Sequence, residues 1–175
     1  MMNLNTQPIP RRVEDIDWTS WIPKDRATLL FVIRDDRILL IHKKRGLGAG
    51  KINGPGGRLE PGEQPIDAAI REVQEELLTT PAGVRPCGEL FFQFTDGYSI
   101  HGYVFRADGC DPEPGETGEA KPEWFALDAI PYDRMWADDR LWLPLMLDSI
   151  PFVGRFVFEG DAMLSHRITH PLQSP

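Results

Sequence analysis

Three glutamates near the middle of the 175-residue chain form the densest acidic group with a recognisable spacing. Glu72, Glu75 and Glu76 fall within about one turn if the surrounding stretch is a helix. Three neighbouring carboxylates repel one another, so the simplest interpretation is a solvated acidic face that weakens the helix slightly. Oxygen ligands at this density also suit a hard divalent cation such as magnesium or manganese. The three residues by themselves leave both interpretations open.

The surrounding residues predict a helix from Pro65 onward that places these acids on the side opposite its apolar face. Pro65 suits the first helical position, because its missing N–H would have no partner there. The glycines and prolines between 54 and 62 exclude regular structure and predict a tight loop that leads into the helix. The apolar residues recur at helical spacing and form a single face, which consists of Ile66, Ala69, Ile70, Val73 and Leu77.

Taken together, the loop and the helix resemble the Nudix box. Gly57 is followed after five residues by Glu63, and after seven more by the run Arg71 to Glu76. Such a set of fixed offsets rarely arises by chance, and the chain is identified on it as a member of the Nudix hydrolase family. The box normally closes with a glycine and an aliphatic residue, whereas here Leu78 and Thr79 occupy those positions. That glycine resembles a helix C-cap, so the departure bears on the helix end and leaves the acids in place.

The family resemblance implies a role for the acidic and basic residues of the box. Glu72, Glu75 and Glu76, with the backbone carbonyl near Gly57, resemble the ligands of magnesium, with manganese as the alternative. Metals that bridge a phosphate would polarise phosphorus and lower the pKa of a bound water. Two further residues resemble structural members of the box: Glu63 orients the helix, and Arg71 is its salt-bridge partner.

Composition places the chain among ordinary water-soluble proteins with room for one core. It is 41% hydrophobic and 26% charged, with a net charge of −8. No basic surface stands out, which argues against a nucleic-acid polymer and leaves a small phosphorylated ligand as the expected partner. Cys87 and Cys110 lack metal-like spacing and are expected to be free thiols in a reducing cytoplasm. No transmembrane run or signal-peptide core is found, so we expect no membrane association.

The rest of the chain predicts more strands than helices. A second amphipathic helix is predicted over 135–147, kinked at Pro144, and the Gly- and Pro-rich acidic segment 107–123 is predicted to be a surface loop. The fold class is therefore α/β in the broad sense (α+β): a Nudix fold, with a mixed β-sheet sandwiched between α-helices. Strands are predicted at 27–33, 37–42, 88–94, 100–105, 123–127, 152–158 and 163–168.

These elements divide the chain into an N-terminal extension (1–26), a Nudix hydrolase domain (27–170) and a short tail (171–175). The extension contains Trp18 and Trp21, which indicate docking either on the domain itself or on a second subunit. A substrate lid is a third possibility, with nothing specific to support it. The sequence leaves open whether the protein is a monomer or a dimer.

Beyond the box, the chain is similar to the MutT-homologue branch of the family, which hydrolyses oxidised purine nucleoside triphosphates. The similarity runs through the segments 43–57, 88–94 and 119–125, and through 129–147, where MWADDRLW is the most branch-specific stretch. It implies that Glu119 completes or activates the metal cluster and that Lys43 faces the phosphates.

For the purine base, the same similarity implies a recognition set of Asn53, Phe92, Phe94, Trp136, Asp138 and Asp139. Trp136 would stack on the ring. Asp138 and Asp139 would meet the purine edge, and crowding would leave one of them protonated so that it can donate. The competing interpretation is that this acid pair merely flanks a helix N-terminus. The lining also departs from the branch, because Leu47, Ile52 and Pro55 stand at positions that are aromatic there.

The sequence thus predicts a magnesium-dependent pyrophosphohydrolase for oxidised purine nucleoside triphosphates such as 8-oxo-dGTP. Its products would be the nucleoside monophosphate and pyrophosphate. One alternative is a Nudix hydrolase of another nucleoside diphosphate derivative, such as a dinucleotide or a nucleotide sugar. A non-catalytic nucleotide sensor is a second alternative, disfavoured because all the expected acids of the box are intact.

Overall fold

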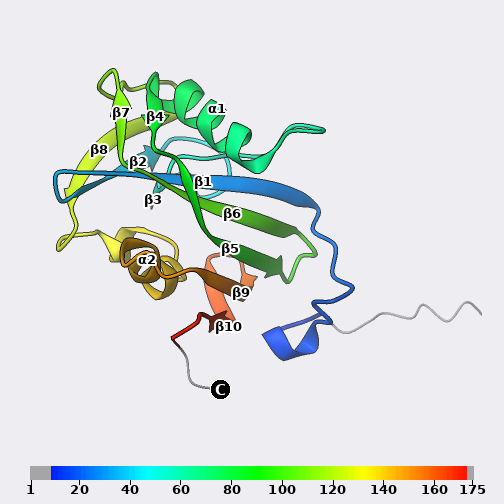
Figure 1. Ribbon diagram of the computed structural model, residues 1–175. Coiled ribbons are helices and arrows are strands. Elements are labelled where there is room, and N and C mark those ends of the chain that lie inside the picture. Colours follow the sequence, from blue (N-terminus) through cyan, green and yellow to red (C-terminus); the bar gives the residue numbers. More distant parts are fainter. Residues whose placement is uncertain (1–8, 173–175) are drawn as a thin grey trace, which may run out of the picture.

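The computed structural model describes residues 9–172, which build one mixed sheet with a helix on each side (Figure 1). Helix α1 (Pro65–Leu77) packs on β1 (Asp25–Arg34), β6 (Ser99–Ala107) and β8 (Ala120–Ala126), and α2 (Asp139–Leu147) packs against β9 (Phe152–Glu159) on the opposite side. The predicted α+β architecture is confirmed. The strands of the sheet are β1 (Asp25–Arg34), β2 (Arg37–Lys43), β3 (Ile52–Asn53), β5 (Arg85–Phe94), β6 (Ser99–Ala107), β8 (Ala120–Ala126), β9 (Phe152–Glu159) and β10 (Ala162–Thr169).

The strand order is β10-β9-β5-β6-β1-β2-β3, with β8 paired to β2. The pairs β1–β6 and β5–β9 are parallel, and the other pairs are antiparallel. A separate two-stranded sheet joins β4 (Thr80–Ala82) to β7 (Gly109–Asp111). Most ends of the long strands lie one to three residues beyond the predicted ends.

Alternation along β1 explains why the molecule has two apolar cores. Leu30 and Val32 face α1 and join its apolar side, where Val73 and Leu77 are buried. Phe31 points to the opposite face and packs edge-on against Trp142 of α2, with ring centroids 5.8 Å apart. Both faces of the central sheet are therefore buried, which explains the continuous apolar run of this strand.

Two sequence predictions are wrong in detail. The second helix begins at Asp139 rather than at residue 135, because a 3₁₀ turn (Tyr132–Arg134) comes first and Met135 is extended. The segment 107–123 is not entirely a surface loop, since its ends pair as β7 and β8. Short polar strands of this kind have no periodicity of their own and form only because a partner strand is present.

The N-terminal segment lies against the domain's own sheet. A 3₁₀ turn, Val13–Asp15, contacts β9 and β10, and Trp18 and Trp21 lie beside Phe91 of β5 with ring centroids 6.3 and 5.6 Å away. Of the alternatives raised by the sequence, packing on the domain is the one observed. The division of the chain at residue 26 stays a prediction, and residues 1–8 and 173–175 lie outside the described part.

Candidate active site

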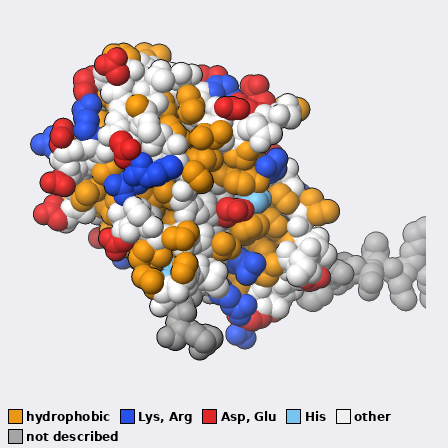
Figure 2. Space-filling model, in the orientation of Figure 1, with side chains coloured by type: hydrophobic (Ala, Val, Ile, Leu, Met, Phe, Trp, Pro, Cys, Tyr) orange, Lys and Arg blue, Asp and Glu red, His pale blue; other side chains and the backbone are white. Residues whose placement is uncertain are grey.

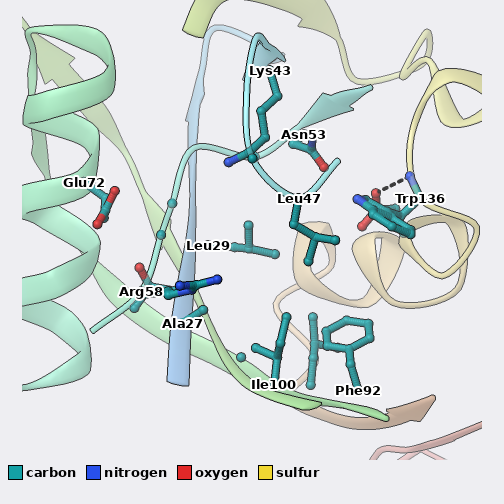
Figure 3. Close-up of a pocket in the computed structure, with 18 of the residues that line it drawn as sticks. Ala27, Leu29, Lys43, Leu47, Asn53, Arg58, Glu72, Phe92, Ile100 and Trp136 are labelled. Carbon is teal, nitrogen blue, oxygen red and sulfur yellow. Dashed lines mark hydrogen bonds between the residues drawn. The ribbon is translucent and has the colours of Figure 1, made fainter. Parts of the chain in front are cut away.

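A pocket of about 560 Å³ opens between the two helices and contains most of the predicted site residues (Figure 3). One side, here called the acid end, is lined by Glu72, Glu76, Glu119 and Lys43. The other side, the aromatic end, is lined by Asn53, Phe92, Phe94, Trp136, Asp138, Asp139 and Phe158. Residues from 27 to 158 in the sequence thus meet in one cavity, as Figure 3 shows for Lys43, Glu72, Phe92 and Trp136.

Glu76 is the most buried group of the acid end. Its side chain is only 4% exposed, Oε2 accepts the backbone N–H of Gly56 at 3.0 Å, and Oε1 lies 3.9 Å from Nζ of Lys43. Burial raises the pKa of Glu76 to about 7, and the charges of Glu72 and Glu119 push it in the same direction. The Lys43 charge and the Gly56 hydrogen bond lower this pKa but do not offset the effect of burial.

Arg71 organises the outer side of the acid cluster. Its guanidinium donates to Glu63 at 2.8 and 2.9 Å, to Glu72 at 2.8 Å and to Glu75 at 3.1 Å. The hydrogen bond from Arg71 lowers the pKa of Glu63 to about 2. This geometry supports the structural roles expected for Glu63 and Arg71, which stay predictions. Glu75 is 60% exposed and does not line the pocket, so its expected place among metal ligands also stays a prediction.

The backbone of Gly57 runs directly against the Glu72 carboxylate. A Cβ added at Gly57 would lie 2.4 Å from the carboxyl carbon of Glu72, so no larger residue fits without movement. Glu119 lies on the same pocket wall and is paired with Arg45. Burial raises the pKa of Glu72, and Glu75 and Glu119 add to this. Carboxylates that raise each other's pKa repel one another, and a hard cation bound between them would offset this repulsion. The residues therefore fit a divalent metal.

The arrangement observed is nevertheless not a closed metal centre. Between residues 9 and 172, no three His, Cys, Asp or Glu side chains converge as ligands of one ion. Glu72 and Glu75 are both engaged by Arg71, and Glu119 by Arg45. A cation bound here would compete with these guanidinium groups for the same oxygens.

Two adjacent buried acids define the aromatic end. Asp138 and Asp139 are 2% and 6% exposed. Oδ2 of Asp138 accepts the indole N–H of Trp142 at 2.8 Å, and Oδ2 of Asp139 accepts the backbone N–H of Trp136 at 3.2 Å. Burial raises the pKa of Asp138 to about 6. It raises that of Asp139 well above its ordinary value, to which the charge of Asp138 contributes.

The position of the acid pair argues against the interpretation that the two residues merely flank a helix N-terminus. Asp138 occupies the N-cap position of α2, but its side chain makes no capping hydrogen bond. Both residues instead line the pocket. Nearby, Nδ2 of Asn53 is buried with no hydrogen-bond partner among residues 9–172, which is costly unless a ligand supplies an acceptor.

Several lining residues were not anticipated from the sequence. They are Thr28, Leu29, Arg58, Tyr98, Ile100 and Phe158. Thr28 had a usable signal, because it is the only polar residue in the apolar run 27–33. Its Oγ1 is buried and lacks a partner within the described chain. Of the three positions that depart from the branch, Leu47 lines the pocket, whereas Ile52 and Pro55 do not.

Comparisons with known proteins assign this fold and site to a class. A family model described as the NUDIX domain matches residues 23–146, and the chain belongs to that family. It is a Nudix hydrolase, and enzymes of this family generally use divalent metal ions.

Named relatives narrow the similarity further. The chain is 44% identical over 145 residues to the "Oxidized purine nucleoside triphosphate hydrolase" of Danio rerio, which covers 81% of this chain and 92% of the relative. The protein of that name from Mus musculus is 38% identical with the same coverage. Among solved structures, a MutT protein from Bacillus halodurans superposes with a TM-score of 0.74 at 26% identity, covering 82% of this chain and 97% of that one.

Proposed function

We propose that this pocket hydrolyses oxidised purine nucleoside triphosphates, such as 8-oxo-dGTP, to the nucleoside monophosphate and pyrophosphate. The observation that carries the proposal is the buried acid pair Asp138–Asp139, which lines the same cavity as the acidic residues of α1. The names of the relatives from Danio rerio and Mus musculus support the same substrate class. The function would be the removal of damaged nucleotides from the free pool.

At the aromatic end, the chain's own residues would hold the base. Trp136 offers its ring for stacking, and its edge meets Phe158 at 5.6 Å between centroids. Asn53 supplies an unsatisfied amide N–H to a purine acceptor. A protonated carboxyl of the Asp138–Asp139 pair donates a hydrogen bond and its ionised neighbour accepts one. Relocating that proton would let the pair match both an oxidised guanine and an oxidised adenine.

At the acid end, Glu72, Glu76 and Glu119 would hold the divalent cation with the carbonyl of Gly57, and Glu75 would contribute from the same helix. Magnesium is the ion we favour, with manganese as the alternative. When bound, it supplies Lewis-acid polarisation of the phosphate and activation of water. Lys43, whose Nζ already lies near Glu76, would neutralise charge on the phosphate chain. The catalytic acids Glu75, Glu76 and Glu119 therefore act through ion binding.

The partner we expect is a free nucleotide. On the face shown in Figure 2, acidic and basic side chains are interspersed around a central apolar area. The net charge of −8 also disfavours binding to a nucleic-acid polymer. No helix in residues 9–172 is long and apolar enough to cross a membrane. Cys87 and Cys110 are free thiols, which is consistent with the cytoplasmic location we propose.

A nucleotide panel tests this function. Substrate consumption and products would be measured with saturating magnesium for 8-oxo-dGTP, 2-hydroxy-dATP, dGTP and dATP, and for a dinucleotide and a nucleotide sugar. We expect the oxidised purine triphosphates to give the highest kcat/KM, with one pyrophosphate per turnover. Preferential cleavage of the dinucleotide or nucleotide sugar into two monophosphates would contradict the proposal while leaving the family assignment intact.

A further inference from the structure

The N-terminal segment 11–24 forms a continuous band of contacts on the sheet face opposite the pocket. Val13 is 1% exposed, its backbone N–H reaches Oγ of Ser165 at 3.1 Å, and Arg11 pairs with Glu159 at 2.7 Å. Glu14 pairs with Arg167 at 2.7 Å. These contacts fasten the segment to β9 and β10. Side chains from both strands of this hairpin thus hold the segment on the sheet.

The same segment contacts the hairpin turn between β5 and β6 from both of its strands. The indole N–H of Trp21 donates to Oε1 of Gln93 at 2.9 Å, in β5. The backbone N–H of Lys24 donates to Oγ of Ser99 at 3.0 Å, at the start of β6. These two hydrogen bonds thus anchor both strand ends that flank the five-residue turn 94–98 to the N-terminal segment.

Gln93 passes the contact on to the turn itself. The Nε2 of its side-chain amide donates to the backbone carbonyls of Phe94 and Tyr98 at 3.0 and 3.1 Å. Across the sheet, the side chains of Phe94 and Tyr98 line the pocket, with their ring centroids 5.8 Å apart. One amide group thus joins the N-terminal segment on one face to two pocket residues on the other.

The turn is also hydrogen-bonded to β9, the strand that contains Phe158. The backbone N–H of Thr95 donates to the carbonyl of Phe158 at 2.9 Å. Phe158 lines the pocket and packs against Phe94 with ring centroids 5.7 Å apart. Its neighbour Glu159 is the partner of Arg11. The segment therefore holds both strands that present Phe94 and Phe158 to the base.

We propose that residues 11–24 are a positioning brace that sets the aromatic end of the pocket, with Trp21 and Gln93 as the positioning residues. The brace acts on substrate affinity, and this part rests on the proposed function. Neither residue touches the pocket, so chemistry at the acid end is unaffected. Loss of the Trp21 hydrogen bond lets the turn move and loosens the stacking surface offered to the base.

The chain supplies a matched pair of variants to test the brace. Trp21→Phe removes the N–H donor to Gln93 but keeps an aromatic ring in place. Trp18→Phe is the control, because its indole N–H donates within the segment, to the carbonyl of Val13 at 2.8 Å. We expect Trp21→Phe to raise KM for the best purine triphosphate by about fivefold with kcat kept, on the scale of one neutral hydrogen bond. Trp18→Phe should change KM by less than about twofold.

A second readout does not depend on the substrate. Hydrogen–deuterium exchange of the peptide spanning residues 94–99 should become faster in Trp21→Phe and stay unchanged in Trp18→Phe, because the turn amides lose their support. Gln93→Met, which keeps length without donors, should reproduce both effects. In the double variant the effects should be non-additive, as expected for two links of one chain of contacts.

The outcomes separate the two proposals. Wild-type KM together with wild-type exchange in Trp21→Phe overturns the brace, and so does faster exchange with an unchanged KM. Equal effects of Trp21→Phe and Trp18→Phe would also overturn it, since they indicate only a general loss of packing. If the wild-type enzyme turns over no purine triphosphate, the proposed function fails; the exchange experiment, and KM for whichever nucleotide is cleaved, then decide on the brace.

Discussion

The two ends of the pocket hold carboxylates in contrasting surroundings. At the acid end, each acid has a cation nearby: Lys43 near Glu76, Arg71 on Glu72, and Arg45 on Glu119. At the aromatic end, the hydrogen bonds to Asp138 and Asp139 come from neutral donors, an indole and a backbone amide. Burial raises the pKa at both ends, but only the acid end has charges that could be exchanged for a metal ion.

This difference explains how one cavity can do two kinds of chemistry. Acids that lie beside cations can exchange those partners for a metal ion, which would hold them in the ionised form and suits phosphate hydrolysis. Acids surrounded by neutral donors and apolar rings keep a proton near neutral pH, which suits hydrogen bonding to a neutral base.

The largest effect is expected at the acid end. Glu76→Gln keeps the shape of the side chain and removes its charge, so turnover should fall by about two orders of magnitude or more if Glu76 holds the metal ion. Pyrophosphate release would be measured across a magnesium titration. Asp67→Asn is the control, since Asp67 is an exposed acid in the first turn of the same helix. Near wild-type turnover at saturating magnesium would remove Glu76 from the ligand set.

At the aromatic end, Asp138→Asn and Asp139→Asn each eliminate one protonation pattern at nearly constant size. At least one should weaken the transition state for oxidised purines by about 2–4 kcal/mol, the scale of a buried charge-assisted hydrogen bond. The relative rates for 8-oxo-dGTP and 2-hydroxy-dATP should shift as well, because Asn cannot relocate a proton. Pyrimidine triphosphates, if they are cleaved, should respond little.

The control for this pair is Asp133→Asn, because Asp133 is exposed and pairs with Arg140 outside the pocket. Equal kcat/KM for wild type and both pocket variants on every purine would reduce the pair to helix flanks. The enzyme would then be a Nudix hydrolase of undetermined substrate.

The raised pKa of Asp138 also predicts a pH-dependent stability. Its folded pKa of about 6 exceeds its ordinary value of 3.8, so the folded state binds the proton more tightly. The stabilising contribution of this bound proton to the folded state is fully present below about pH 4. It is lost as the pH rises through 6, because the ionised carboxylate must then be buried. Between pH 4 and 7, the unfolding free energy of wild type should fall by about 2 kcal/mol relative to Asp138→Asn. Urea denaturation without metal measures this difference, and parallel pH profiles for the two proteins would contradict it.

The smallest effect concerns the end of α1, where the box departs from its usual glycine. Leu78 adopts the left-handed conformation with φ of 56° and its side chain is largely exposed. Leu78→Gly should raise the unfolding free energy by about 1 kcal/mol, because glycine adopts this conformation without steric cost. Leu78→Ala retains a Cβ and should gain less. Thermal unfolding measures both, and a destabilised glycine variant would show that the Leu78 side chain matters more than its backbone.

Local pattern alone determined much of the architecture. The start of the helix at Pro65 is predicted correctly, because Pro65, the apolar face and the preceding glycine-rich loop all indicate it. The long strands were located within a few residues because both β1 and β2 carry continuous apolar runs. The acids that face the pocket were also found from the sequence, through their spacing and the family resemblance.

Only the tertiary structure decided which residues surround those acids and how the pocket wall is held. The approach of Lys43 to Glu76, the hydrogen bond from Gly56 to Glu76 and the pairing of Arg45 with Glu119 all depend on segments that meet only in the folded chain. The contact of Trp21 with Gln93 joins residues 72 positions apart and has no local signature. Burial and long-range contacts set the pKa and the position of a side chain. The periodicity of the sequence indicates only which face of its own helix or strand a residue occupies.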